Sequence, residues 1–248
     1  MPRPGKALMA VMVAILAIWV LFAMGINWGG ANPEVLRPFI GSSVAVLHGQ
    51  VWHLFTAPLI HNPSESSHVL ITLLGLYFLG PSLEDRWGPR KTLLFLLGSA
   101  VFAFALEVLV GAAIPRFASP TWIGGLGMVE AIAVAWALNN RDARVNLFFV
   151  LPVSGTMLLV FIFGMSVLNV IAPHAPPEGL VTPFGGMLAG YLFGDASPLR
   201  RLWLKLRLRR LQAETAAFTG PRRPRGGPPL RVIPGGGDRP PKDRRDLN

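Results

Sequence analysis

The chain has 248 residues, of which 52% are hydrophobic and 15% are charged. Soluble domains carry about 25% charged residues, so the composition excludes an ordinary cytosolic enzyme. Cysteine is absent, which excludes disulfide frameworks, thiolate metal sites and cysteine nucleophiles. The net charge of +10 comes entirely from the C-terminal part, because residues 1–195 hold nine basic and nine acidic side chains, whereas residues 196–248 hold 14 basic and four acidic ones.

Six apolar segments predict an all-α, polytopic membrane protein with six transmembrane helices. A span needs about 20 apolar residues to cross roughly 30 Å of hydrocarbon. Residues 7–26 are 20 residues without a charge, too long for a signal peptide and without a clear small-x-small cleavage site. In the last, short segment, Gly185, Gly186 and Gly190 predict close packing against neighbouring helices. Gly124 and Gly127 in the fourth segment are expected to serve helix packing in the same way. The remaining predicted spans are residues 68–83, 91–114, 122–138, 145–171 and 182–193.

The basic residues predict the orientation of these helices. With the N-terminus in the cytoplasm, residues 1–6, 81–91, 139–144 and the tail are cytoplasmic, and they contain 21 of the 23 Lys and Arg residues. Because positive residues stay on the cytoplasmic side, we expect both termini in the cytoplasm and location in the cell (inner) membrane.

Two stretches outside the spans have distinct compositions. The long outer loop, residues 27–67, contains Trp28 and Trp52 and short amphipathic pieces at 35–40 and 51–59, which favours a folded element at the membrane interface. We therefore predict a membrane domain at 1–195, a basic juxtamembrane segment at 196–211 that alternates leucine with charge, and a disordered Pro/Gly/Arg-rich tail at 212–248.

Residues 49–98 carry a set of motifs in a recognisable order. These are W-x-L-x-T-x-x-x-x-H from Trp52 to His61, a second histidine, His68, that opens a helix, and a short turn with Leu83, Glu84 and Gly88. Together with the fifth and sixth spans, the chain over residues 28–195 resembles the rhomboid intramembrane serine proteases. The resemblance implies the rhomboid six-helix fold.

The resemblance also implies where catalytic residues would lie. Rhomboids use a serine in G-x-S-G on the fourth helix and a histidine before G-G on the sixth. Here the first motif reads from Gly124 to Gly127 with Leu126 at the nucleophile position, and Pro183 stands at the histidine position before Gly185 and Gly186. Leucine has no proton to lose and the proline side chain cannot accept one, and loss of either partner costs several powers of ten in rate. The chain therefore resembles a rhomboid pseudoprotease.

The second helix of rhomboids supplies oxyanion-stabilising groups in an H-x-x-x-N pattern. Here the two former oxyanion positions hold His68 and Thr72, and only the histidine is retained. His61 and His68 are seven residues apart instead of five, which indicates a two-residue insertion between them. Ser67 adjoins His68, but neighbouring helix residues point about 100° apart and do not face each other. We therefore interpret Ser67 as a helix N-cap. A relocated serine nucleophile is kept as the alternative.

Glu130 and His61 form a candidate polar cluster with the former oxyanion residues. Glu130 lies four residues after Leu126 and therefore on the same helix face. An ionisable residue inside a membrane helix is by default expected to be functional. The alternative is that the Glu130 carboxyl is protonated and donates a hydrogen bond to His68 or Thr72, which serves structure only. A zinc site of His61, His68 and Glu130 lacks a compact ligand motif, so we expect no metal and no cofactor. Glu107 is expected to reach the interface.

These observations predict a catalytically inactive rhomboid-like protein that recognises or handles transmembrane segments of client proteins. The alternatives are a divergent rhomboid-type serine endopeptidase with a relocated nucleophile and a transporter or proton-linked channel built on Glu130. The expected partners are the lipid bilayer, transmembrane clients and, for the basic tail, anionic lipid headgroups. Nucleic acid is not an expected partner, because no nucleic-acid-binding motif accompanies the basic residues.

Overall fold

The structure is a computed structural model that describes residues 3–140, 144–147, 151–171 and 177–218. It is mostly helical and divides into two units, residues 1–204 and residues 205–248. The part of the predicted tail at 219–248 lies outside the described residues, as does His174, a histidine before the predicted sixth span.

Each of the six predicted spans contains a helix in the first unit. Of these helices, α1, α4 and α5 are long and apolar enough to cross a membrane, whereas α6 and α7 are shorter apolar helices. The helices are α1 (Lys6–Asn27), α4 (Ser66–Trp87), α5 (Pro89–Ala113), α6 (Leu126–Asn139), α7 (Gly155–Ile171) and α8 (Thr182–Phe193).

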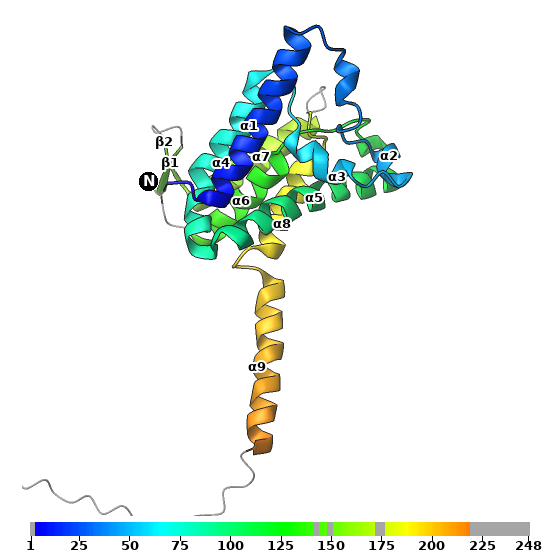
Figure 1. Ribbon diagram of the computed structural model, residues 1–248. Helices are drawn as coiled ribbons and strands as arrows, with labels where there is room; N and C mark the ends of the chain where they lie inside the picture. The colour runs from blue at the N-terminus through cyan, green and yellow to red at the C-terminus, as the bar shows by residue number, and fades with distance from the viewer. Residues whose placement is uncertain (1–2, 141–143, 148–150, 172–176, 219–248) are drawn as a thin grey trace, which may run out of the picture. The chain divides into compact units, whose positions relative to one another are not determined.

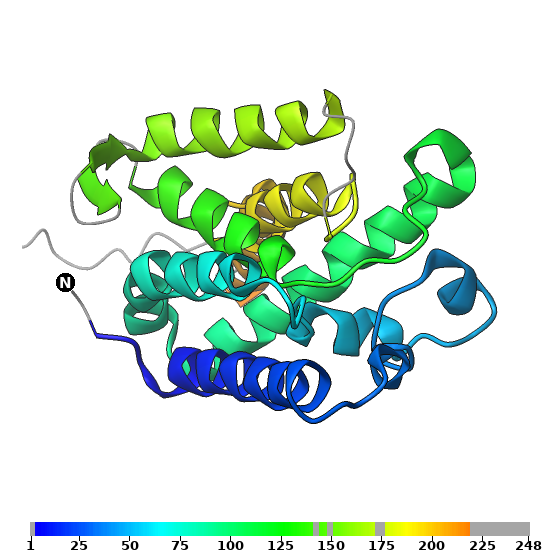
Figure 2. The ribbon, with the colours of Figure 1, turned by 90° about the horizontal axis from the view of Figure 1, so that it is seen from above.

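Helix α6 lies at the centre of the bundle. It contacts α4, α5, α7 and α8, and its residues from Ala131 to Ala137 are all buried. Seen from above, α1 and α7 lie on opposite outer sides of the bundle, with α4 and α6 between them (Figure 2). Helix α1 packs against α4 and α5, so α4 separates it from α6 (Figures 1 and 2).

Small residues allow α8 to approach its neighbours closely. A Cβ atom on Gly185 would lie 2.7 Å from Ala103 Cα of α5, and one on Gly186 would lie 2.5 Å from the Gly127 carbonyl oxygen of α6. A Cβ on Gly190 would overlap the Ala131 carbonyl oxygen. These contacts are with backbone atoms, so larger side chains would force the helices apart.

Two buried glutamates cap helices that are distant in sequence. The Glu84 carboxylate in α4 accepts hydrogen bonds from Ala7 N–H (2.8 Å) and Leu8 N–H (3.1 Å) at the start of α1. The Glu107 carboxylate in α5 accepts hydrogen bonds from Val181 N–H (2.6 Å) and Thr182 N–H (2.9 Å) at the start of α8. First-turn N–H groups lack partners within their own helix, and the helix dipole favours a negative charge there.

The burial of Glu107 corrects the expectation that this residue reaches the membrane interface. Its exposed fraction is 0%. The N–H groups at the start of α8 provide hydrogen bonds that compensate for the burial of the carboxylate.

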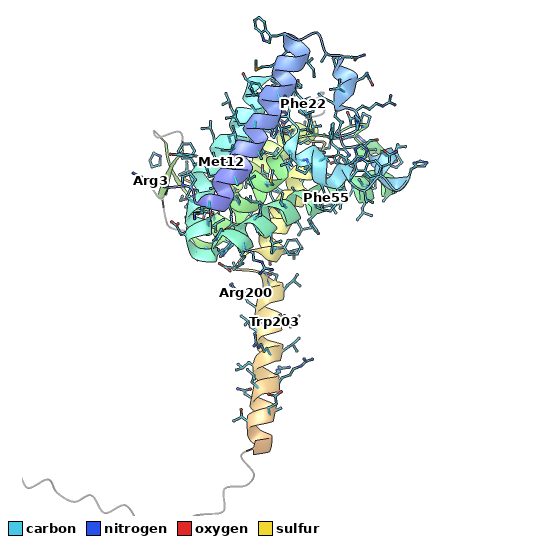
Figure 3. All side chains as sticks on the ribbon, in the orientation of Figure 1. Arg3, Met12, Phe22, Phe55, Arg200 and Trp203 are labelled. Atoms are coloured by element: carbon cyan, nitrogen blue, oxygen red, sulfur yellow. The ribbon has the colours of Figure 1, made fainter. Side chains whose placement is uncertain are left out.

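The outer loop is folded, as its aromatic content indicates. It contains η1 (Pro33–Leu36), α2 (Ser43–Leu47), α3 (His53–Thr56) and η2 (Ala57–Leu59). An antiparallel bridge between Gly41 and Trp122 attaches it to the segment before α6, where Trp122 stacks on Phe104 with ring centroids 4.3 Å apart. The side chains of Phe22 and Phe55, from α1 and α3, are labelled in Figure 3.

Two predicted spans begin later than expected. The fourth was expected from residue 122, but α6 begins at Leu126, because the N–H groups of residues 122–124 are hydrogen-bonded to the carbonyls of Gly41, Pro177 and Ala57. The fifth was expected from residue 145, but α7 begins at Gly155. Before it, β1 (Arg144–Leu147) and β2 (Leu151–Ser154) pair as antiparallel strands, so this short segment departs from a fold that is otherwise mostly helical, as predicted.

Helix α9 (Pro198–Phe218) follows α8 and includes residues 212–218, which the sequence analysis assigned to the disordered tail. Its described side chains, at 198–215, are all exposed, and the sticks project from every side of the helix, as the labelled Arg200 and Trp203 illustrate (Figure 3). The alternation of leucine with charge explains this, since a period of two spreads leucines around a helix of 3.6 residues per turn.

Asp195 connects three elements at the end of α8. Its carboxylate accepts hydrogen bonds from Trp87 Nε1–H, from Lys91 Nζ at 2.9 Å and from Arg200. Burial by itself would raise the pKa of Asp195, but the hydrogen bonds from Trp87 and Lys91 and the charges of Lys91 and Arg200 hold that pKa below its ordinary value. The network favours the ionised carboxylate and ties α4, α5 and the start of α9 to the end of α8.

Candidate functional site

A cavity of about 400 Å³ opens between α4 and α7, with α6 along its floor. This volume is within the range of ligand-binding pockets. The walls are mainly apolar, with Ile71 and Leu74 on α4 and Phe161, Ile162 and Met165 on α7. Five polar lining residues, Glu65, Ser67, His68, Glu130 and Glu178, form what we call the polar end, and Ser166 and Asn169 of α7 also line the cavity.

Leu126 and Pro183 occupy the two former catalytic positions. Leu126 lines the cavity as the first residue of α6. Pro183 is buried in the first turn of α8, where proline is well tolerated because the missing N–H would have no helical partner. A Cβ on Gly127, next to Leu126, would lie 3.5 Å from Cγ2 of Thr182, next to Pro183, so the starts of α6 and α8 lie close together. The arrangement therefore presents an aliphatic side chain at the nucleophile position.

His68 is held at both ring nitrogens. Asn62 N–H donates to His68 Nδ1 at 3.1 Å, so Nδ1 carries no proton and Nε2 is the protonated nitrogen. His68 Nε2–H then donates to Glu178 Oε1 at 2.9 Å. Gly124, with a φ of +112°, makes room for this pair, because a Cβ there would lie 2.6 Å from His68 Nε2. Gly124 thus serves the polar cluster rather than helix packing.

His61 and Thr72 form a second, inner polar layer. Gly125 N–H donates to His61 Nε2 at 3.3 Å. The Thr72 hydroxyl lies 3.1 Å from the same nitrogen and 3.4 Å from the His68 carbonyl oxygen, so it is hydrogen-bonded within this layer. The His61 and His68 ring centroids lie 4.9 Å apart. Burial, together with the neighbouring His68, lowers the pKa of His61 to about 3. His61 is therefore a neutral acceptor that fixes the backbone just before α6.

Glu130 is not bonded to the partners that the sequence analysis named. Its exposed fraction is 6%, and its Oε2 atom has no hydrogen-bond partner among the described residues. His68 is hydrogen-bonded to Glu178, and Thr72 to His61. The carboxylate that interacts electrostatically with Glu130 is that of Glu178, so the cluster brings two acids together where an acid and a base were expected.

Ser67, the candidate nucleophile, and the histidines of the candidate zinc site make hydrogen bonds other than those expected. The Ser67 hydroxyl donates to Glu65 Oε1 at 2.9 Å, and within the described ranges no serine is hydrogen-bonded to a histidine. In the same part of the chain, no group of three His, Asp or Glu residues has the geometry to hold a metal ion. His61 and His68 are instead engaged by backbone N–H groups.

Glu178 is the member of the site that sequence reasoning missed. It follows Pro177, whose carbonyl accepts a hydrogen bond from Ile123 N–H at 3.0 Å, and this contact places Glu178 over the start of α6. The available signal was weak: one acid five residues before Pro183, in an otherwise uncharged outer segment. Its partner His68 is 110 residues away in the chain.

Comparison with known proteins agrees with the arrangement of helices and motifs. Residues 48–197, more than half of the chain, match the family described as Rhomboid domain. A relative named Rhomboid protease GlpG from Enterobacter sp. (strain 638) is 32% identical over 146 residues, which is 56% of this chain and 49% of the relative. Rhomboid protease GlpG from Salmonella choleraesuis (strain SC-B67) is 29% identical over 153 residues, or 61% of this chain and 49% of that protein. The chain thus matches about half the length of these curated relatives.

Proposed function

Since the chain belongs to the rhomboid family, we propose that it is a catalytically inactive membrane protein that holds transmembrane segments of client proteins without cutting them. The observation that carries this proposal is the cavity between α4 and α7, with Leu126 where the family has its nucleophile. The apolar walls match the chemistry of a membrane-spanning helix.

The side chains at the former catalytic positions support inactivity. A serine protease needs a hydroxyl and a base within hydrogen-bond reach, and Leu126 and Pro183 supply neither group. His68 cannot substitute as the base in this arrangement, because Asn62 and Glu178 engage its two nitrogens. Thr72, whose hydroxyl is hydrogen-bonded to His61, is 1% exposed and does not line the cavity.

The surfaces of the flanking helices support entry of a client from the side. Leu70 and Ile71 on α4 are 50% and 59% exposed, and Val160 and Phe161 on α7 are 68% and 58% exposed. Exposed apolar side chains are compatible with lipid or with another transmembrane helix. A client could therefore exchange lipid contacts for contacts with α4 and α7 at little hydrophobic cost.

The proposal includes a membrane topology and two further partners. Six spans with both termini in the cytoplasm agree with the distribution of Lys and Arg, and in a bacterium this corresponds to the inner membrane. The basic residues of α9 and of the following tail would then lie near anionic lipid headgroups, where each favours binding by about 1 kcal/mol.

Site-specific photocrosslinking tests the proposal. A photoreactive amino acid is placed at Phe161, in the cavity, and in a separate protein at Leu94, which is 63% exposed on α5. The probe is a single-span reporter protein with polar residues in its span, reconstituted with the full chain in lipid vesicles. We expect an adduct with the intact reporter from position 161, and little from position 94. Equal crosslinking from the two positions would reject the cavity as the binding site.

The same sample distinguishes the enzyme alternative, which the names of the relatives favour. We expect no reporter cleavage above a blank without the protein, and no labelling of the chain by a fluorophosphonate probe. Cleavage that a serine-directed inhibitor abolishes would establish a relocated nucleophile and overturn the inactive assignment.

A further inference from the structure

We propose that the cavity between α4 and α7 selects client segments that carry a lysine or arginine, and that Glu130 receives this basic side chain. This inference rests on the proposed function and specifies its client class. It concerns the polar end of the cavity, where Glu130 lies one helical turn, or about 6 Å, along α6 from Leu126.

The charges that line the cavity all have one sign. Glu65, Glu130 and Glu178 contribute carboxyl groups, and no lysine or arginine is present among the described residues that line the cavity. Apolar side chains cover most of the remaining surface, together with the uncharged Ser67, Ser166 and Asn169, so limited screening by water is expected around these groups. Such an environment attracts a cation and repels an acidic side chain.

The three carboxyl groups differ in how they are satisfied within the chain. Glu178 accepts a hydrogen bond from His68, and Glu65 accepts one from Ser67. Glu130 is buried, with an exposed fraction of 6%. Its Oε2 atom has no hydrogen-bond partner in the described structure. A buried acceptor without a donor is costly, and this one belongs to a residue that lines the cavity.

A lysine or arginine on a client helix supplies what Glu130 lacks. Both side chains carry only hydrogen-bond donors on a long apolar stem. The stem can lie along Ile71 and Leu74 while the charged group reaches Glu130. In lipid the same basic side chain is costly in free energy, and in the free protein Glu130 Oε2 lacks a hydrogen-bond donor. Binding of the basic side chain at Glu130 removes both costs.

Binding of synthetic peptides to the full chain in lipid nanodiscs tests the inference. The probe is a fluorescent leucine/alanine helix of about 22 residues with one lysine, placed in turn at each position of its outer two turns. The matched peptides carry leucine, glutamine, glutamate or acetyl-lysine instead. We expect the lysine peptide, at its best position, to bind at least about tenfold more tightly than every matched peptide.

The peptide series separates failure of the inference from failure of the proposed function. Equal binding of the lysine and leucine peptides would overturn the charge selection while leaving segment binding intact. Tighter binding of the glutamate peptide would also overturn it. Absence of binding by every peptide would reject both the inference and the proposed function. Because the acetyl-lysine comparison changes only the ligand, it does not depend on the folding of a variant.

Variants of the chain then locate the effect. Glu130→Gln should reduce the preference for lysine over leucine by about tenfold, measured as the ratio of the two affinities in the same folded variant. Glu34→Gln is the matched control, since Glu34 is exposed and pairs with Arg37 outside the cavity. A lysine preference that is unchanged in a folded Glu130→Gln protein would remove Glu130 as the receiving group.

Discussion

His68 Nε2 and Glu178 Oε1 lie 2.9 Å apart and connect α4 to the segment that precedes α8. Both side chains are buried, with exposed fractions of 6% and 9%. Both residues line the cavity. The bond therefore fixes the Glu178 carboxylate relative to α4, the helix that carries the former oxyanion residues. In the rhomboid arrangement implied by the motifs, this histidine would face a substrate; here it faces an acid of its own chain.

The His68–Glu178 bond should contribute measurably to stability. Glu178→Gln keeps the shape but removes the charge, and we expect it to reduce the free energy of unfolding by about 1–2 kcal/mol, because hydrogen bonds to charged groups are the stronger ones. Thermal unfolding in detergent measures the loss. Glu34→Gln, which breaks an exposed pair with Arg37, should cost under about 0.5 kcal/mol. A cycle with His68→Gln in which the two losses simply add would contradict a direct bond.

Glu107 should act as the N-terminal cap of α8. Glu107→Leu leaves the Val181 and Thr182 N–H groups without their acceptor, and we expect a loss of about 2–3 kcal/mol. Glu107→Gln retains one acceptor oxygen and should cost less. Hydrogen exchange at the two amides provides a local readout, and it should accelerate in the leucine variant. Unchanged exchange together with an unchanged melting temperature would show that the cap contributes nothing.

The contact between Gly186 and Gly127 should limit what α8 tolerates. Gly186→Ala places a methyl group 2.5 Å from the Gly127 carbonyl oxygen, and we expect a loss of about 1–3 kcal/mol from overpacking. Gly98→Ala is the matched control on α5, where a Cβ meets no atom within 4 Å. There the higher helix propensity of alanine should leave stability equal or raise it by up to about 1 kcal/mol. Equal melting temperatures for the two variants would refute close packing at Gly186.

Apolar composition predicted the positions of α1, α5 and α8 well, because a largely apolar run has few structural alternatives in a membrane. It failed in the first part of the predicted fifth span, where Arg144–Leu147 and Leu151–Ser154 form the paired strands β1 and β2. Periodicity does not separate a short apolar strand from a helix, and Pro152 in this run was a sign against a helix interior. For α6, the glycine pair Gly124 and Gly125 marked where extended backbone ends.

The site was only partly predictable for a different reason. The face shared by Leu126 and Glu130 follows from helix geometry, and the structure places both on the cavity. The partner of His68 did not follow, because Glu178 is 110 residues away and belongs to no periodic segment. Local patterns specify which face a side chain occupies, whereas contacts between distant segments depend on how the whole bundle packs.

His61 should make stability depend on acid pH. Burial lowers its pKa to about 3 from the ordinary 6.5, so between these values the unfolded chain binds a proton that the folded chain does not. Stability is therefore complete above pH 6.5 and falls as the pH falls toward 3. His61→Gln keeps an acceptor for Gly125 N–H without the titration. We expect the wild type to lose on the order of 3 kcal/mol more than this variant between pH 7 and pH 4, measured by thermal unfolding in detergent. His48→Gln removes an exposed histidine and should follow the wild type. Parallel pH curves for the wild type and His61→Gln would show that His61 titrates alike in the folded and unfolded chain.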